Sequence, residues 1–153
     1  MFPIIAIVLL LALPAFATNF SVCAVGPAPT AVRLQGCDDN CLLRPGDSVR
    51  AQVDIRPGGR VTSLQADLYA AEAAHLLDDS DGCAHLVAGA CPIEAGHAAT
   101  YAFNATVRVQ ALGKLTMHFT LTDQAVDNVA CFDLQITVVN GTAWEPRAAT
   151  DRA

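Results

Sequence analysis

Alternation of apolar and polar residues with a period of two dominates this sequence beyond its first 17 residues. Across residues 48–56, Val49, Ala51, Val53 and Ile55 alternate with polar side chains. Successive side chains of a β-strand point to opposite faces, so this pattern is typical of a strand with one buried face. The same alternation predicts strands over 63–70, 100–109, 114–122 and 131–138, and shorter ones over 20–24 and 30–34.

Turn signals separate the predicted strands. The Arg-Pro-Gly-Gly-Arg stretch at 56–60 favours a turn, because proline restricts one backbone dihedral and glycine accepts positive φ. Residues 70–77 have some helix propensity, but we expect them to be the end of a strand that runs into a loop. About seven half-buried strands without long helices predict an all-β fold, a β-sandwich of two antiparallel sheets.

The N-terminus resembles a signal peptide. Residues 2–16 are almost entirely apolar and end at an Ala-x-Ala cleavage signal at Ala17, and the run is shorter than the roughly 20 residues of a membrane span. No Lys or Arg precedes it, so an uncleaved anchor is the alternative. We expect a signal peptide over 1–17, one domain over 18–139 and a polar tail over 140–153. Three glycosylation sequons agree with secretion, at Asn19, Asn104 and Asn140.

The charge of the chain excludes two classes of partner. The net charge is −6, and Lys114 is the single lysine, so the chain lacks the basic surface that binds nucleic acid or captures anionic membranes. No second apolar run is long enough to span a bilayer. We expect a monomeric protein that is secreted and extracellular, or lies in the lumen of a lysosome or endosome.

Six cysteines in a short secreted chain predict a disulfide framework. Their spacing favours two small local loops and one long-range bridge between the two ends of the domain. The Cys-x3-Cys pair formed by Cys37 and Cys41 has a spacing that zinc also uses. An oxidising compartment favours a small disulfide loop there instead. The remaining cysteines are Cys23, Cys83, Cys91 and Cys131.

Other candidate chemistry in the sequence is weak. Residues 78–82 resemble a fragment of a calcium loop, but Gly89 stands where an EF-hand needs its bidentate Glu, so we expect a solvated turn. His118 falls on the polar face of its strand and is expected to be exposed; a pH-sensing role for the histidines is the alternative. There is no Gly-x-Ser-x-Gly elbow and no phosphate loop. We therefore expect no enzymatic activity, no cofactor and no metal site.

Several short motifs, in this order, resemble one family. They are Asp81-Gly82-Cys83, Cys91-Pro92-Ile93, Thr100-Tyr101, Leu121-Thr122-Asp123 and Val129-Ala130-Cys131-Phe132. In combination they resemble the ML lipid-recognition family, and within it the soluble Niemann-Pick type C sterol carriers. The resemblance extends from about Cys23 to Val139.

The resemblance implies an immunoglobulin-like, seven-stranded sandwich with a lipid cavity between its sheets. It also implies three disulfides, Cys23–Cys131, Cys37–Cys41 and Cys83–Cys91. Leu121 and Ile136 are expected to fill the deeper core. The cavity wall implied by strand matching consists of apolar and aromatic side chains: Leu68, Leu76, Tyr101, Val107, Val109, Leu115, Met117, Phe119, Phe132 and Leu134.

The sequence departs from the sterol carriers near the expected cavity mouth. Residues 72–77 lack their prolines and aromatics, one mouth aromatic falls near His75, and the loop 110–113 lacks the second. These departures concern which lipid is bound. We expect a lipid-binding and transfer protein that carries a sterol or another single lipid in intracellular sterol transport and delivers it to a membrane or a membrane receptor.

Two alternatives share the predicted fold. A lipid-recognition co-receptor module in innate immunity would favour basic residues at the mouth, to meet lipid phosphates. The expected mouth loop carries Asp78, Asp79 and Asp81 instead, which argues against this role. The other alternative is a phospholipid transfer protein.

Overall fold

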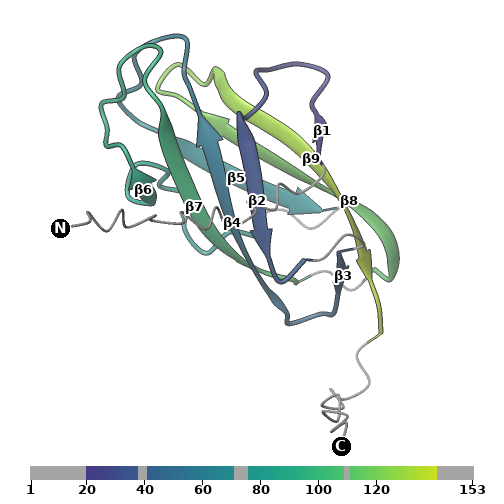
Figure 1. Cartoon of the computed structure of the whole chain (residues 1–153). Helices are drawn as coiled ribbons and strands as arrows, with labels where there is room; N and C mark the ends of the chain where they lie inside the picture. The colour runs from purple at the N-terminus through teal and green to yellow at the C-terminus, as the bar shows by residue number, and fades with distance from the viewer. Residues whose placement is uncertain (1–19, 38–40, 71–75, 109–110, 141–153) are drawn as a thin grey trace, which may run out of the picture.

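The computed structural model describes residues 20–37, 41–70, 76–108 and 111–140. The predicted signal peptide and all but the first residue of the predicted tail lie outside this range. The described residues form two facing sheets, as the sequence pattern predicts, with nine strands where it predicts about seven (Figure 1). No helix within these residues is long and apolar enough to cross a membrane.

The two sheets have different sizes and orders. The five-stranded sheet has the order β1 (Ser21–Val22), β9 (Asn128–Val138), β8 (Gly113–Thr122) and β5 (Gln65–Ala70), and β3 (Leu42–Leu43) also pairs with β9. The four-stranded sheet has the order β2 (Ala31–Gln35), β4 (Ser48–Ile55), β7 (Ala99–Thr106) and β6 (Leu86–Ala88).

The five longest strands lie where alternation predicts them, and β4 shows why. Its inward side chains are all buried, whereas its outward ones are exposed or half-buried. The two short strands β3 and β6 were not predicted, since two or three residues carry no readable period. One strand pair also departs from the antiparallel expectation, because β3 runs parallel to β9 with Leu42 opposite Thr137.

The core between the sheets is apolar. Among the described residues, no charged residue is buried, and Tyr101 is the one buried residue with a polar side-chain group. Removal of these apolar surfaces from water is the main force that holds the two sheets together.

Three disulfides connect the framework, and they are the pairs that the family resemblance implies. Cys23–Cys131 joins the chain just after β1 to β9. Cys37–Cys41 closes a small loop before β3, so the zinc alternative for this pair does not hold. Cys83–Cys91 closes a loop around β6.

One segment, residues 76–88, contacts an edge of each sheet and is called the strap below. The Leu76 N–H donates to the carbonyl of Leu68 on β5, at 2.8 Å. The next residue, Leu77, forms an isolated β-bridge with Ala105 on β7. The strap therefore links the five-stranded sheet to the four-stranded sheet along one side of the sandwich.

Farther along, the strap lies tightly against the start of β5. The Gly82 N–H donates to the carbonyl of Leu64 at 2.9 Å, and a Cβ added to Gly82 would lie only 2.7 Å from the Leu64 Cβ. Any other residue at position 82 would displace the strap or Leu64. The motif glycine thus has a packing role.

Candidate functional site

A small pocket lies between the sheets at the end of the sandwich where β5 and β7 finish. Its volume is about 10 Å3, far below the roughly 300–1,000 Å3 of a ligand site. Side chains therefore fill this space almost completely. Its lining comes from both sheets and the strap: Val49, Ala70, Leu76, Ala105, Thr106, Val107, Met117 and Ile136.

Three of the predicted wall residues meet at this pocket: Leu76, Val107 and Met117. Ile136, which we expected deeper in the core, also lines it. The alanines at 70 and 105 were missed, because small side chains give no pattern beyond their inward position. Because their side chains are small, these two alanines leave space in the core at the pocket.

The predicted aromatic wall residues form a separate cluster. The rings of Phe119 and Phe132 lie 4.9 Å apart between centroids, and Tyr101 lies 5.9 Å from Phe119. Phe103, which the sequence placed inward but not in the wall, stacks on Phe119 at 5.2 Å. Phe20 joins the cluster at its edge, 5.7 Å from Phe132.

The other predicted wall residues are divided between core and periphery. Leu68 and Leu134 are buried in the shared core, whereas Leu115 is only partly buried. Val109 lies outside the described residues, as does His75.

The Tyr101 hydroxyl is the unusual polar group of this interior. It is buried and has no hydrogen-bond partner among the described residues. Burial raises the pKa of the Tyr101 hydroxyl, and the negative charges of Asp79, Asp67 and Asp81 act in the same direction. The group therefore stays neutral and offers both a donor and an acceptor.

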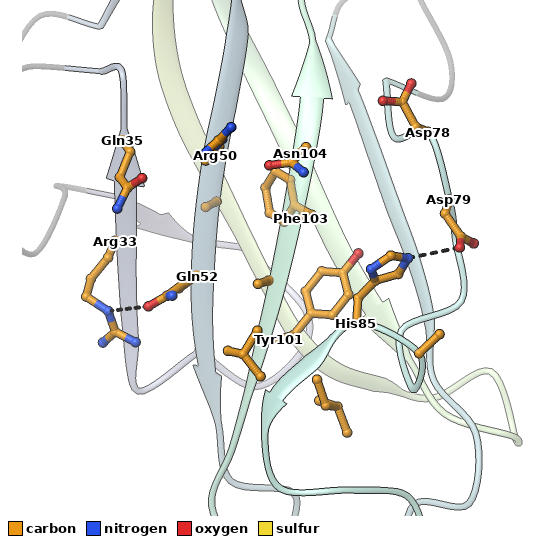
Figure 2. Close-up of a pocket in the computed structure, with 15 residues that line it drawn as sticks. Arg33, Gln35, Arg50, Gln52, Asp78, Asp79, His85, Tyr101, Phe103 and Asn104 are labelled. Carbon is orange, nitrogen blue, oxygen red and sulfur yellow. Dashed lines mark hydrogen bonds and ion pairs between the residues drawn. The ribbon is translucent and has the colours of Figure 1, made fainter.

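A second, larger space is a groove of about 540 Å3 that lies over the outer face of the four-stranded sheet (Figure 2). Its lining also includes the buried residues Ala51, Tyr101 and Phe103, so the groove reaches the predicted wall residue Tyr101. Two cross-strand rows form its floor. One row is Gln35, Arg50 and Asn104, and the other is Arg33, Gln52 and Ala102. The strap residues 84–87 border the groove beyond β7.

At one side of the groove, Arg33 is held in a two-pronged ion pair with Asp54, at 2.6 and 2.7 Å. The Thr100 hydroxyl also donates to Asp54 at 2.7 Å. The hydrogen bond from Arg33 holds the pKa of the Asp54 carboxyl below its usual value, against the opposing effect of burial. Arg50, in contrast, has no side-chain partner among the described residues.

The acidic strap residues have polar partners both within the strap and outside it. Asp78 pairs with Arg108 at 2.6 Å, and Asp79 pairs with His85 at 2.9 Å. The Asp81 carboxylate accepts the backbone N–H groups of Cys83 and Ala84. Backbone donation from Asp81, followed by His85, lowers the pKa of Asp79. The side chains of Asp78 and Asp79 are exposed, as in the solvated turn that the sequence predicts.

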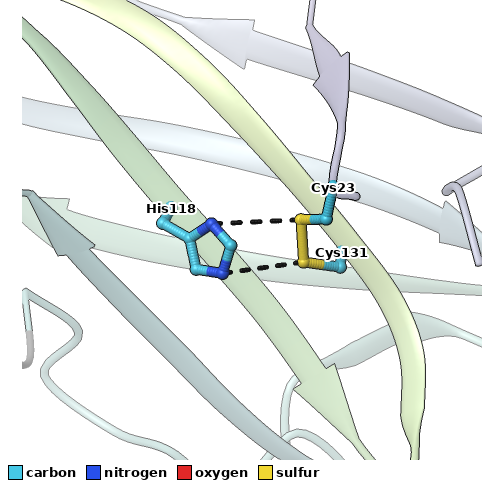
Figure 3. A group of neighbouring side chains, drawn as sticks. All are labelled: Cys23, His118 and Cys131. Atoms are coloured by element: carbon cyan, nitrogen blue, oxygen red, sulfur yellow. Dashed lines mark hydrogen bonds between the residues drawn. A yellow bond between two sulfur atoms is a disulfide. The ribbon is translucent and has the colours of Figure 1, made fainter. Parts of the chain in front are cut away.

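His118 is less exposed than its place on the polar face predicted. It pairs with Asp133 and lies beside the Cys23–Cys131 disulfide, with Nε2 3.7 Å from the Cys131 sulfur (Figure 3). The ring of Tyr69 covers it, 5.0 Å away. His118 and the two sulfurs are close enough to surround a metal ion. Both sulfurs are bonded to each other, however, and a disulfide supplies no thiolate ligand.

Comparisons with known proteins agree with this architecture. The family model of the ML domain matches residues 17–138. No curated protein sequence matches the chain significantly. Among solved structures, the chain is similar to a Niemann-Pick type C2 protein from Japanese carpenter ant, with a TM-score of 0.60 and 12% identity over 79% of this chain and 99% of that one. The chain therefore belongs to the ML domain family, and its family and fold support lipid binding.

Proposed function

We propose that this protein is a secreted or lysosomal carrier that binds a sterol, or another lipid with one small polar group, between its sheets. It releases the lipid unchanged at a membrane or a membrane receptor, with no catalytic step. One observation carries the proposal: within the described part of this ML-family sandwich, the interior is apolar apart from a single unpaired hydroxyl, that of Tyr101.

The pocket must expand to take a lipid, and its lining suits expansion. Leu76 and Met117 have several rotatable bonds, and Met in particular adapts to irregular spaces. Burial of the lipid's apolar surface gains about 25 cal/mol per Å2, which offsets the loss of contacts between the side chains that separate. The pocket is lined by the last residues of β5 and β7, so it lies at one end of the sandwich, and this end is where we place entry.

The position of Tyr101 gives the bound lipid a direction. Tyr101 and Val107 both point inward and are six residues apart along the β7 segment, which spans about 20 Å in extended chain. A lipid that enters beside Val107 and lies along β7 brings its leading end toward the Tyr101 hydroxyl. A sterol with one hydroxyl satisfies that buried group with one hydrogen bond.

The charges around the pocket end favour a neutral lipid over a phosphorylated one. Recognition of lipid phosphate relies on Arg or Lys side chains. Arg108 stands near this end but is already paired with Asp78, and Asp79 and Asp81 follow on the strap. This pattern disfavours the innate-immunity alternative and the anionic phospholipids.

The direct test is to identify and then replace the bound lipid. Protein purified from secreting cells is extracted and its lipids are identified by mass spectrometry. Delipidated protein is then titrated with sterol and with phospholipid vesicles. We expect saturable binding of one sterol per chain, and protein that binds neither lipid class would overturn the proposal.

A pocket-filling variant locates the site. Ala105→Leu adds volume where the pocket lies, so lipid affinity should fall by about tenfold or more while secretion persists. Ala66→Leu adds the same volume to a fully buried position of β5 that does not line the pocket. Equal losses of affinity in both variants would place the lipid elsewhere.

A further inference from the structure

The groove on the four-stranded sheet contains an acceptor for N-linked glycosylation. Asn104 begins the sequon Asn104-Ala105-Thr106 and is exposed on the outward face of β7. Its side chain has no hydrogen-bond partner among the described residues. Figure 2 shows it within the groove, between Arg50 and the strap side. A glycan attached here would begin inside the groove.

The groove surface has the chemistry that binds sugars. Arg50 is directly opposite Asn104 in the strand pairing, and its guanidinium is unpaired among the described residues. Gln35 and Gln52 add amide donors and acceptors on the same floor. Sugars present many hydroxyl groups, each of which needs a hydrogen-bond partner when it leaves water.

The floor is also hollowed where a ring would lie. Ala102, the smallest side chain of its row, lies between Gln52 and the strap, where the carbonyl of His85 accepts the Ala102 N–H at 3.0 Å. The volume of about 540 Å3 is in the range of small-ligand sites.

We propose that this groove holds the protein's own N-linked glycan, attached at Asn104, with the first N-acetylhexosamine units packed against Arg50 and Ala102. The Asn104 amide nitrogen forms a bond to the anomeric carbon of a lipid-pyrophosphate-linked oligosaccharide. The anomeric C–O bond breaks, the lipid pyrophosphate leaves, and the amide loses one proton. This inference rests on the secretory route of the proposed function and is independent of which lipid is carried.

Because the glycan is covalently attached, weak polar contacts are sufficient to keep it in the groove. A tethered ligand has an effective concentration on the order of millimolar or more, so a groove with low intrinsic sugar affinity is still occupied. The seated glycan covers the outer face of the four-stranded sheet, so a protein or membrane partner has to approach another surface.

The chain provides its own comparison site. Asn140 also begins a sequon and is exposed, but it follows the end of β9 and does not line the groove. A glycan on Asn140 is therefore expected to extend freely into solvent.

The test uses the full chain secreted from eukaryotic cells and a peptide N-glycosidase. Removal of each glycan is followed by glycopeptide mass spectrometry, first on native and then on denatured protein. We expect Asn104 to be occupied and its glycan to be removed about tenfold more slowly from native protein than from denatured protein, the scale of one hydrogen bond to a charged group. The glycan on Asn140 should show little difference between the two states.

Slow removal at Asn104 could also arise because the strand itself blocks the glycosidase from the linkage. Two variants distinguish this explanation from a glycan that is bound in the groove. Arg50→Ala should accelerate native removal at Asn104, whereas Arg44→Ala, an exposed arginine outside the groove, should not. An unoccupied Asn104, or a native rate that Arg50→Ala leaves unchanged, would overturn the inference. Lipid binding measured on the same samples tests the carrier function separately.

Discussion

The interior has two halves that are equally buried but differently built. In the aromatic half, Phe119 is in ring contact with Phe103, Phe132 and Tyr101 at 4.9–5.9 Å. In the pocket half, aliphatic side chains such as Leu76 and Met117 meet across a space of about 10 Å3. Aromatic side chains have few rotamers, and they lose their favourable ring–ring contacts when the rings separate. Aliphatic chains lose little by rearrangement, so equal burial does not imply equal resistance to opening.

The strap shows the same contrast along its length. Near the pocket it contributes Leu76, a flexible side chain in the lining. Farther on, Gly82 lies against Leu64 and leaves no room for a methyl group. We infer that the strap is fixed at Gly82 and moves more easily at Leu76, so the sandwich opens first at its pocket end.

The largest effect should follow removal of the central ring. Phe119→Ala deletes the side chain that contacts three other rings, and we expect it to lower the free energy of unfolding by about 3–5 kcal/mol. Met117→Leu, on the same strand but in the pocket half, should cost less than about 1.5 kcal/mol. Urea denaturation of both variants checks this, and similar losses would remove the distinction between the halves.

A smaller loss is expected from Gly82→Ala. The added methyl group meets Leu64, so the strap or Leu64 must move, at a cost of about 1–3 kcal/mol. Gly58→Ala is the matched control, because nothing lies within 4 Å of its added methyl group. Thermal unfolding compares them, and lipid exchange should also quicken in Gly82→Ala. A neutral result at position 82 would show that the strap is not fixed there.

Tyr101→Phe should have opposite effects on stability and on binding. Loss of an unpaired buried hydroxyl should raise the free energy of unfolding by about 1 kcal/mol. If this hydroxyl meets the lipid head, affinity for a hydroxylated sterol should fall by about tenfold, and affinity for the same skeleton without its hydroxyl should not. Parallel titrations of the two ligands decide whether the lipid reaches the aromatic half.

The smallest effect concerns the outer face. Because the pKa of Asp54 is lower in the folded protein than in the unfolded chain, its charged form stabilises the fold above the ordinary carboxyl pKa of about 4. That contribution disappears as the pH falls through the lower, folded-state pKa. Asp54→Asn should therefore narrow the stability difference between pH 6 and about pH 3 by less than about 1 kcal/mol. Lipid affinity at pH 6 should not change, since Asp54 is outside the interior.

The strands were predictable because each carries its own period, and β4 and β7 have every inward residue buried as expected. Pairings between segments that are distant in sequence were not predictable. The parallel β3–β9 contact joins residues far apart in sequence, and no local pattern encodes it. His118 was expected to be exposed because its own strand says nothing about Asp133 or the disulfide beside it.

The pocket itself was the least predictable feature. Alternation identifies inward residues such as Ala70 and Ala105, but not which of them face one another across the sheets. Whether the space between facing residues is full depends on side-chain volumes contributed by five strands and the strap. The sequence therefore predicted an apolar interior, but it did not predict the size of the space inside it.

The Cys23–Cys131 bridge has a topological consequence. It closes a covalent ring across a sequence separation of 108, so almost the whole domain lies inside one macrocycle. A single peptide-bond cleavage between these cysteines, for example at the exposed turn 124–127, opens the ring but leaves one molecule. Two separated pieces require either a second cut or reduction of the bridge. A single nick between the two cysteines therefore leaves both sheets within one covalent molecule.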